Sequence, residues 1–437
     1  MKTVYTILLA LISQLTFAQS DFVTRWNLAT AGSGATQLSF GVATSGSVSY
    51  TWTEVSPGTA TGSGVFSGSP ANITGLPAGA IIELSISPVN FQRFIINNGP
   101  DKNRLIDVSQ WGTTAWTSML NAFWGCANLQ VGADDVPNLS GVTDMGLMFR
   151  DCAVLNGPAN IGTWNTENVT VMFGLFNGAR AFNQPLGNWN TQNVTSMSYM
   201  FLAAEAFNQP IGNWNTQNVK DMASMFSEAR VFNQPIGNWN VQNVTTMYYM
   251  FGAATAFDQP LGNWTLKPSV SLTSVFNGTA LSCYNYSETL KGWSANPNTP
   301  NGLTLDAFGR TYSPSAAAAR YNLNINKGWG IFGDAQSGTE CLGVLSYFNT
   351  RWDLSLAGSG ATQLSFDVVT SGDVAYSWTE ASPGNATGAG TFSGATATIA
   401  GLPAGAMIDL QISPVNFQGI RINNGADKDR LVSVSQW

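Results

Sequence analysis

The feature that most constrains this chain is a 25-residue phrase, WNTQNVTSMSYMFLAAEAFNQPIGN, repeated between Trp164 and Trp264. Several residue types recur at this spacing: Trp164, Trp189, Trp214, Trp239 and Trp264; Met172, Met197, Met222 and Met247; Phe176, Phe201, Phe226 and Phe251; and Pro185, Pro210, Pro235 and Pro260. A unit this short cannot bury its own apolar residues, so neighbouring copies must share a core. The period therefore predicts a stack of coils.

The array extends upstream of Trp164, because the pattern Val-x-x-Met-x-x-Met-Phe returns at Val142 and a fainter copy begins at Trp111. We expect seven coils over residues 111–281, with small insertions in the first two. Within a coil, residues 186–191 are predicted to form a short strand. Residues 194–201 are predicted to form one to two helical turns, because their apolar residues recur at helical spacing. Asn193 is expected to cap this helix.

The coils contain the sequence motifs NWNTQNVTSMSYMF and FNQPIGN. The motif DKNRLIDVSQW directly precedes the coils, and YSETLKGWSANPN begins the exit segment, which follows them. These motifs strongly resemble those of the BspA-type leucine-rich-repeat surface proteins of bacteria, and the resemblance extends over nearly the whole chain. It implies an exported, leucine-rich-repeat-like solenoid that binds a ligand, and members of this family are often called adhesins. We therefore expect a mixed α/β fold, in which a solenoid of short strands and short helices is flanked by small β-sandwich modules.

Both flanks of the array carry a β pattern. Residues 21–110 alternate apolar and polar side chains and contain turn-forming Gly, Ser and Pro clusters, which predicts a small β-sandwich of immunoglobulin or fibronectin type. Residues 348–437 repeat residues 22–111 at an offset of 326, with 63 of 90 positions identical, so a second module is expected. Residues 282–341 are predicted to cap the solenoid, and residues 342–347 to be a linker. Because the second copy stops at Trp437, the counterpart of Trp111, we expect the sequence to be a fragment of a longer chain.

Residues 1–20 have the form of a secretory signal peptide, with Lys2 ahead of an apolar run from Val4 to Phe17. No cysteine stands at the expected cleavage point, so no lipid anchor is expected. No later stretch reaches the roughly 20 apolar residues that a membrane span needs. The sequence therefore predicts a secreted or cell-surface protein without a membrane span.

The composition restricts the chemistry. The chain has no histidine and a formal net charge of −7, and its 18 Lys and Arg residues are scattered. Histidine is the usual general base and the commonest zinc ligand, and nucleic-acid binding needs clustered basic residues. We therefore expect no catalytic residues, no metal, no cofactor and no nucleic-acid partner. Asp134, Asp135, Asp144 and Asp151 cluster in the first coils, but their spacing does not mark an acid and base pair.

The candidate binding residues flank the tryptophans and are expected to point outward: Asn188, Asn190, Asn213, Asn215, Asn238 and Asn240. They form a ligand-binding strip in one interpretation and a solvated polar face in the other. The tryptophan column also has two interpretations, a sugar-stacking platform and core packing.

The four cysteines fall into two pairs. Cys126 and Cys152 occupy equivalent positions in neighbouring coils, where a disulfide and two buried free thiols are both open interpretations. Cys283 and Cys341 bracket the exit segment, and in an oxidising compartment we expect a disulfide between them.

These observations predict an adhesin-like binding protein, secreted or on the cell surface and monomeric, without catalytic activity. Its partner would be a protein or glycan on another cell or matrix, recognised through the solenoid face. Two alternatives stay open: a structural stalk whose repeats bind nothing, and a glycan-binding module of a larger carbohydrate-active protein. The sameness of the asparagine strip fits either a repetitive ligand or none.

Overall fold

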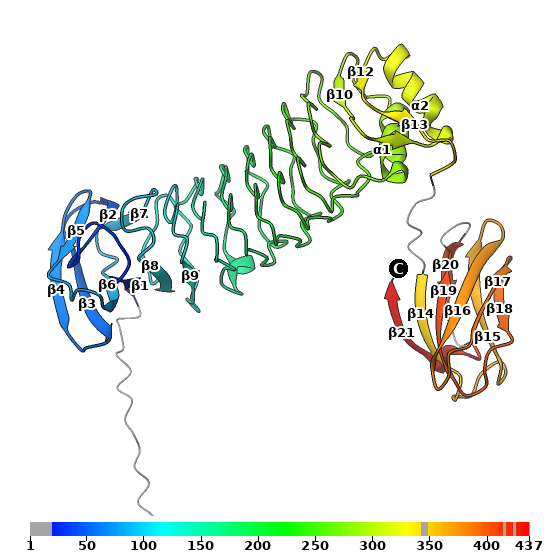
Figure 1. The fold of residues 1–437 in the computed structure, drawn as a ribbon, viewed down its shortest axis with the longest axis horizontal. Coiled ribbons are helices and arrows are strands. Elements are labelled where there is room, and N and C mark those ends of the chain that lie inside the picture. The colour runs from blue at the N-terminus through cyan, green and yellow to red at the C-terminus, as the bar shows by residue number, and fades with distance from the viewer. Residues whose placement is uncertain (1–19, 342–347, 414–416, 423–424, 437) are drawn as a thin grey trace, which may run out of the picture. The chain divides into compact units, whose positions relative to one another are not determined.

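The computed structural model describes residues 20–341, 348–413, 417–422 and 425–436 (Figure 1). The predicted signal peptide, apart from Ser20, and the predicted linker of residues 342–347 lie outside the described residues. The chain divides into two compact units, Met1–Cys341 and Leu342–Trp437. Each unit has its own hydrophobic core.

The first unit begins with the N-terminal sheet module, which consists of two sheets. One has the strand order β4-β3-β6-β1-β8-β9 and the other β5-β2-β7. The bounds are β1 Phe22–Asn27, β2 Gln37–Thr44, β3 Val48–Ser56, β4 Thr61–Phe66, β5 Ala71–Thr74, β6 Ile81–Ile86, β7 Phe91–Ile95 and β8 Leu105–Gln110. Alternate residues of β2 point into the core, at Leu38, Phe40 and Val42, as the period-two pattern requires.

The N-terminal sheet module and the coils that follow share one core. Strand β8 pairs in parallel with β9, Gln130–Val131, which belongs to the first coil. Beside this pair the ring of Trp116 lies 5.1 Å from that of Phe22, and Phe123 lies 5.5 Å from Phe94, measured between ring centroids. The module therefore covers the first coil with a strand pair and with aromatic contacts.

Residues 111–281, the repeat region, form a succession of similar coils (Figure 1). Single parallel bridges join neighbouring coils at equivalent positions, in the series Asp144, Val171, Ser196, Asp221, Thr246 and Ser271. The side chains stack with the same period, since the rings of Phe201 and Phe226 lie 5.6 Å apart and within 6° of parallel. The 25-residue spacing of the sequence is thus the spacing of the contacts between coils.

The predicted fold class, a mixed α/β, leucine-rich-repeat-like solenoid of short strands and short helices, is wrong. The described chain is rich in β-strands, which form several sheets, and its two short α-helices lie outside the repeat region. Within residues 111–281 the regular elements are β9 and a single 3-10 turn, η1, at Ile161–Thr163. The rest of each coil consists of turns and isolated bridges.

Two backbone features exclude the predicted helix at residues 194–201. Tyr199 has a φ of 58°, and a right-handed helix cannot pass through a left-handed residue. The N–H groups of Met197 and Phe201 donate to the carbonyl oxygens of Asp221 and Met225 in the next coil, rather than four residues back. The residues equivalent to Tyr199 in the other coils also have a positive φ: Asn121, Leu147, Gly174, Ser224, Tyr249 and Ser274.

The predicted strand at residues 186–191 and the predicted helix cap at Asn193 are wrong for a related reason. The N–H of Trp189 donates to the carbonyl oxygen of Leu186 at 3.1 Å, which closes a turn. The Asn193 side chain donates to the carbonyl oxygen of Glu167, in the preceding coil, at 2.7 Å. Contacts between coils therefore decide the local conformation here, and they override helix and strand preferences.

Residues 282–341, the cap segment, follow the last coil. The bounds are α1 Cys283–Ala295, β10 Thr304–Asp306, β11 Thr311–Tyr312, η2 Pro314–Ala316, α2 Ala317–Tyr321, η3 Asn322–Asn326, β12 Gly330–Phe332 and β13 Ala335–Gln336. A parallel bridge from Leu272 to Leu305 joins the cap segment to the coils. The ring of Phe276 meets that of Tyr286, on α1, at 6.3 Å. The cap segment thus covers the apolar residues of the last coil.

The second unit, the C-terminal sheet module, has one sheet of order β17-β16-β19-β14-β21 and another of order β18-β15-β20. The bounds are β14 Phe348–Asp353, β15 Gln363–Thr370, β16 Val374–Ser382, β17 Thr387–Phe392, β18 Thr396–Ala400, β19 Met407–Ile412, β20 Phe417–Arg421, η4 Lys428–Arg430 and β21 Leu431–Gln436. This is the strand order of the N-terminal sheet module without β9. The repeated sequence therefore folds twice into the same arrangement.

We expect Ala203→Gly to leave stability unchanged or to raise it by up to about 1 kcal/mol. Ala203 has a φ of 54°, where an alanine costs about 1–2 kcal/mol, and the greater freedom of glycine in the unfolded chain offsets part of the gain. The control Ala204→Gly removes the buried methyl group of the next residue and should cost about 1–2 kcal/mol. Urea unfolding measures both variants. Equal destabilisation by the two would contradict the left-handed conformation.

Candidate functional site

The six asparagines of the predicted strip lie on the surface of the repeat region, in pairs on either side of a buried tryptophan: Asn188 and Asn190, Asn213 and Asn215, and Asn238 and Asn240. The Thr191 hydroxyl donates to the backbone oxygen of Asn215 at 3.0 Å. The Thr216 hydroxyl donates to that of Asn240 at 2.9 Å. The structure therefore brings the pairs of successive coils into register, and we refer to these six residues as the asparagine face.

The side chains of the asparagine face differ in what they bind. Asn190, Asn215 and Asn240 each accept a hydrogen bond from the backbone N–H two residues later, at 3.1, 3.2 and 3.1 Å, which makes an Asx turn. Asn213 donates to the carbonyl oxygen of Gly187 at 2.9 Å. Within the described chain the side chain of Asn188 makes no hydrogen bond, and neither does that of its equivalent, Asn238.

The asparagine face borders a shallow, open depression of ≈ 360 Å³. Its lining consists of Gly162, Thr163, Trp164, Asn165, Thr166, Asn188 and Asn190. Hydroxyl and amide groups dominate this lining, and its one tryptophan, Trp164, is only 2 % exposed. Such a depression suits a ligand that carries several hydrogen-bonding groups.

Sequence reasoning missed four residues of this lining, Gly162, Thr163, Asn165 and Thr166. A signal was present in the spacing of the methionines, because Met145 and Met172 are 27 residues apart whereas the later coils keep to 25. The longer coil contains the 3-10 turn η1, directly before Trp164.

The longer coil, which contains η1, lies directly before a ladder of indole hydrogen bonds. The indole Nε1 of Trp189 donates to the carbonyl oxygen of Ile161 at 2.8 Å, and that of Trp214 donates to Leu186 at 3.0 Å. The Nε1 of Trp164 is buried and has no hydrogen-bond partner. The depression therefore lies where the regular ladder of indole bonds begins.

The tryptophan column is buried. Trp189, Trp214 and Trp239 are 3, 4 and 3 % exposed, and their indoles are hydrogen-bonded to the preceding coil. The rings of Trp214 and Trp239 lie 6.3 Å apart and within 4° of parallel. Core packing is therefore confirmed, and the sugar-stacking platform is wrong, because a buried ring presents no face to a sugar.

A second polar ladder stabilises the corner at which the coils turn. The side-chain oxygen of Asn208 accepts from the backbone N–H of Asn233 and from the side chain of Gln234, both at 2.9 Å. The same pattern joins Asn183 to the coil of Asn208, and Asn233 to the coil of Asp258. These amides are paired within the protein, so the Asn-Gln-Pro corner has a structural role.

Three of the four acidic residues of the first coils have structural roles. Asp135 accepts from the backbone N–H groups of Trp111 and Gly112 at 2.9 and 2.7 Å. Asp144 accepts from the N–H of Gly146 at 2.7 Å, and Asp151 from the indole of Trp124 at 3.2 Å. No group of three His, Cys, Asp or Glu residues is placed to hold a metal ion in the described part of the chain.

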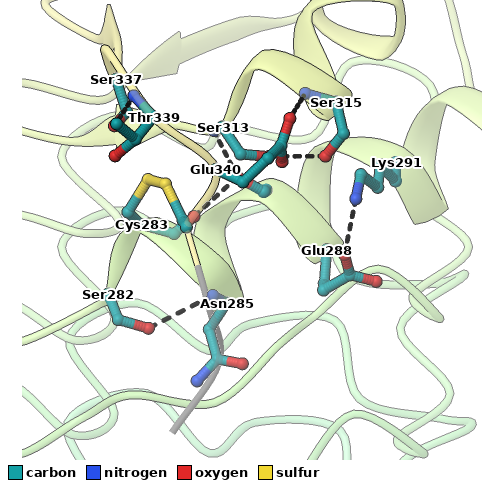
Figure 2. The surroundings of a disulfide bond; sticks show 12 residues. Ser282, Cys283, Asn285, Glu288, Lys291, Ser313, Ser315, Ser337, Thr339 and Glu340 are labelled. Atoms are coloured by element: carbon teal, nitrogen blue, oxygen red, sulfur yellow. Dashed lines mark hydrogen bonds and ion pairs between the residues drawn. A yellow bond between two sulfur atoms is a disulfide. The ribbon is translucent and has the colours of Figure 1, made fainter. Parts of the chain in front are cut away.

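The two cysteine pairs differ in the structure. Cys283 and Cys341 form a disulfide with 5.6 Å between their Cα atoms. Figure 2 shows the adjacent Glu340, whose carboxylate accepts the backbone N–H of Ser315 at 2.8 Å. Cys126 and Cys152 are free and buried. Burial raises the pKa of both thiols, so they stay protonated and weakly nucleophilic at neutral pH.

Comparison with families of known proteins matches the repeat region. Residues 96–203 and 185–293 each match a family model described as "Mycoplasma protein of unknown function, DUF285". The two segments cover the whole repeat region and less than half of the chain. The match is consistent with the resemblance to BspA-type repeat proteins and compatible with a repeat protein of the cell surface.

No curated protein and no solved structure matches the chain. Among the helices of the described residues, none is both long enough and apolar enough to cross a membrane.

We expect Trp214→Ala to destabilise the protein by about 3–5 kcal/mol, because it leaves a cavity between stacked rings and removes one of the two hydrogen bonds that the carbonyl oxygen of Leu186 accepts. Trp214→Phe keeps an aromatic ring and loses the indole hydrogen bond, so its cost should be smaller, about 1–2 kcal/mol. Urea unfolding followed by circular dichroism measures both. A near-neutral alanine variant would show that this tryptophan is not part of the core.

We expect reduction of the Cys283–Cys341 disulfide to lower the stability of the cap segment. The bridge closes a loop with a sequence separation of 58, which corresponds to about 4 kcal/mol on the chain-entropy model. Unfolding with and without reductant measures the difference. In the control Cys126→Ala the effect of reductant should persist, whereas in Cys283→Ser it should vanish. If reductant still lowered the stability of the Cys283→Ser variant, the loss would have to come from other thiols.

Proposed function

We propose that this protein is an adhesin-like binding protein, secreted or displayed on the cell surface, that recognises a protein or glycan without catalysis. The observation that carries the proposal is the polar depression of ≈ 360 Å³ beside the asparagine face. Two residues singled out from the sequence, Asn188 and Asn190, line it together with Thr163 and Thr166. Export is supported by the signal-like sequence of residues 1–20.

The ligand chemistry follows from the groups on this face. Amide and hydroxyl side chains both donate and accept hydrogen bonds, as a glycan or a peptide backbone requires. The chain carries 10% charged residues and a formal net charge of −7, so a polyanionic ligand is disfavoured. A neutral glycan or an extended peptide fits best, and the protein would act as a monomer.

One observation favours the alternative of a structural spacer. Asn190, Asn215 and Asn240 use their side-chain oxygens in Asx turns, so their repetition has a structural reason. Asn188 has no such bond within the described chain and lines the depression, and for this reason we prefer the binding function.

Glycan and protein arrays probed with residues 20–437 test the proposal. We expect saturable binding that Asn188→Ala weakens at least about tenfold, or about 1.4 kcal/mol, while stability changes by less than about 0.5 kcal/mol. Asn238→Ala is the matched variant, because it is equivalent in sequence and does not line the depression. A loss confined to Asn188→Ala places the ligand in the depression, and a loss with both places it along the whole face.

Asn243→Ala serves as a structural control, since its side chain donates to the carbonyl oxygen of Gln217 at 2.7 Å and is not part of the asparagine face. It should lower stability and leave binding unchanged. Arrays without any bound ligand, or binding that neither asparagine variant weakens, would contradict the proposal. The first of these results would favour the spacer.

A further inference from the structure

The C-terminal sheet module has a partly exposed apolar end. The equivalent end of the N-terminal sheet module is covered. Five side chains of the C-terminal sheet module pack at the border of its core and are partly exposed: Phe417, Ile420, Ile422, Leu431 and Val434. The residues 326 positions earlier are at most 5 % exposed: Phe91, Phe94, Ile96, Leu105 and Val108. Both modules have the same strand order, so the difference lies in what packs against them.

In the N-terminal sheet module, the opening coil of the repeat region, residues 111–133, covers this end. The ring of Trp116 lies 5.5 Å from that of Phe91, and the ring of Phe123 lies 5.5 Å from that of Phe94. The N–H of Ile96 donates to the carbonyl oxygen of a neighbouring coil residue, Ala122, at 2.9 Å. The opening coil thus contributes an aromatic pair and backbone acceptors.

The strand edges of the two modules differ in the same way. Strand β8 lies between β1 and β9, and the carbonyl oxygen of Val108 accepts from the N–H of Ala133 at 3.1 Å. Its counterpart β21 is the last strand of its sheet among the residues that the structure describes. An open strand edge beside exposed apolar side chains is a surface that readily pairs with another strand.

We propose that this end of the C-terminal sheet module is a docking surface for the opening coil of a second repeat array, joined to β21 as the first array is joined to β8. The occupant has the chemistry of residues 111–133: an aromatic pair equivalent to Trp116 and Phe123, and a two-residue strand equivalent to β9. Docking covers the five partly exposed side chains and pairs the edge of β21.

The proposal gives the sheet modules a common role. An opening coil has no preceding coil to supply partners for its backbone and its aromatic rings, and the sheet module supplies both for the first array. The C-terminal sheet module retains apolar residues at each of the five positions, although Phe94 is replaced by Ile420. A module that never received a coil would expose these side chains without any compensating contact.

A chain extended by a second array tests the proposal. Residues 112–341 are added directly after Trp437, so that the added coils follow Trp437 as the first array follows Trp111. Amide hydrogen exchange of β20 and β21 is then compared between the original and the extended chain. We expect the amides of β21 to exchange at least about tenfold more slowly in the extended chain, because a paired strand opens only with its module.

The matched control is the same extended chain with alanine in place of the added copies of Trp116 and Phe123. It keeps the covalent link and loses the aromatic pair, so the exchange of β21 should return toward that of the original chain. Unchanged exchange in the extended chain would overturn the proposal, and so would an added array that does not fold. An original chain that sediments as a dimer with β21 already protected would show that a second copy covers this end instead.

Discussion

The hydrogen bonds between successive coils are the interaction on which the rest of this structure depends. The N–H groups of alternate residues, such as Met172 and Phe176, donate to carbonyl oxygens of the next coil, Ser196 and Met200. Buried backbone groups need partners, and here those partners lie about 25 residues away rather than four. The conformation of a coil is therefore set by its neighbours, and the regular coils adopt the same one.

This dependence explains why side chains are repeated as strictly as the backbone. A phenylalanine stacks well only on a phenylalanine at the same height, as Phe207 and Phe232 do with rings 6.1 Å apart. The indole of each regular tryptophan reaches a carbonyl oxygen of the preceding coil, so the ring must sit in the same place each time. A substitution in one coil disturbs the contacts of two others, because each coil contacts only its neighbours.

Sequence reasoning succeeded where the period alone carried the information. The stacking of copies follows from residues that must meet their equivalents, and core packing is one of the two interpretations of the tryptophan column. It failed for the conformation inside a coil. Apolar residues three and four positions apart, as at Met197, Met200 and Phe201, are typical of a helix, but turns interrupted by left-handed residues produce the same spacing. Nothing in the identity of Tyr199 or Ala203 indicates a positive φ, because both residue types rarely adopt one.

Part of the candidate site could likewise be predicted from the sequence, and part could not. Asn188 and Asn190 lie on the surface as predicted, and they flank a tryptophan that is buried. The depression could not be predicted, because it arises from an irregular coil, the one in which η1 precedes Trp164 and the Trp164 indole lacks a hydrogen-bond acceptor. In a perfectly regular array every coil presents the same surface, so no coil is distinguished from the others as a binding site. Departures from the period, at its ends and at its insertions, are therefore the places where this fold can distinguish one surface from another.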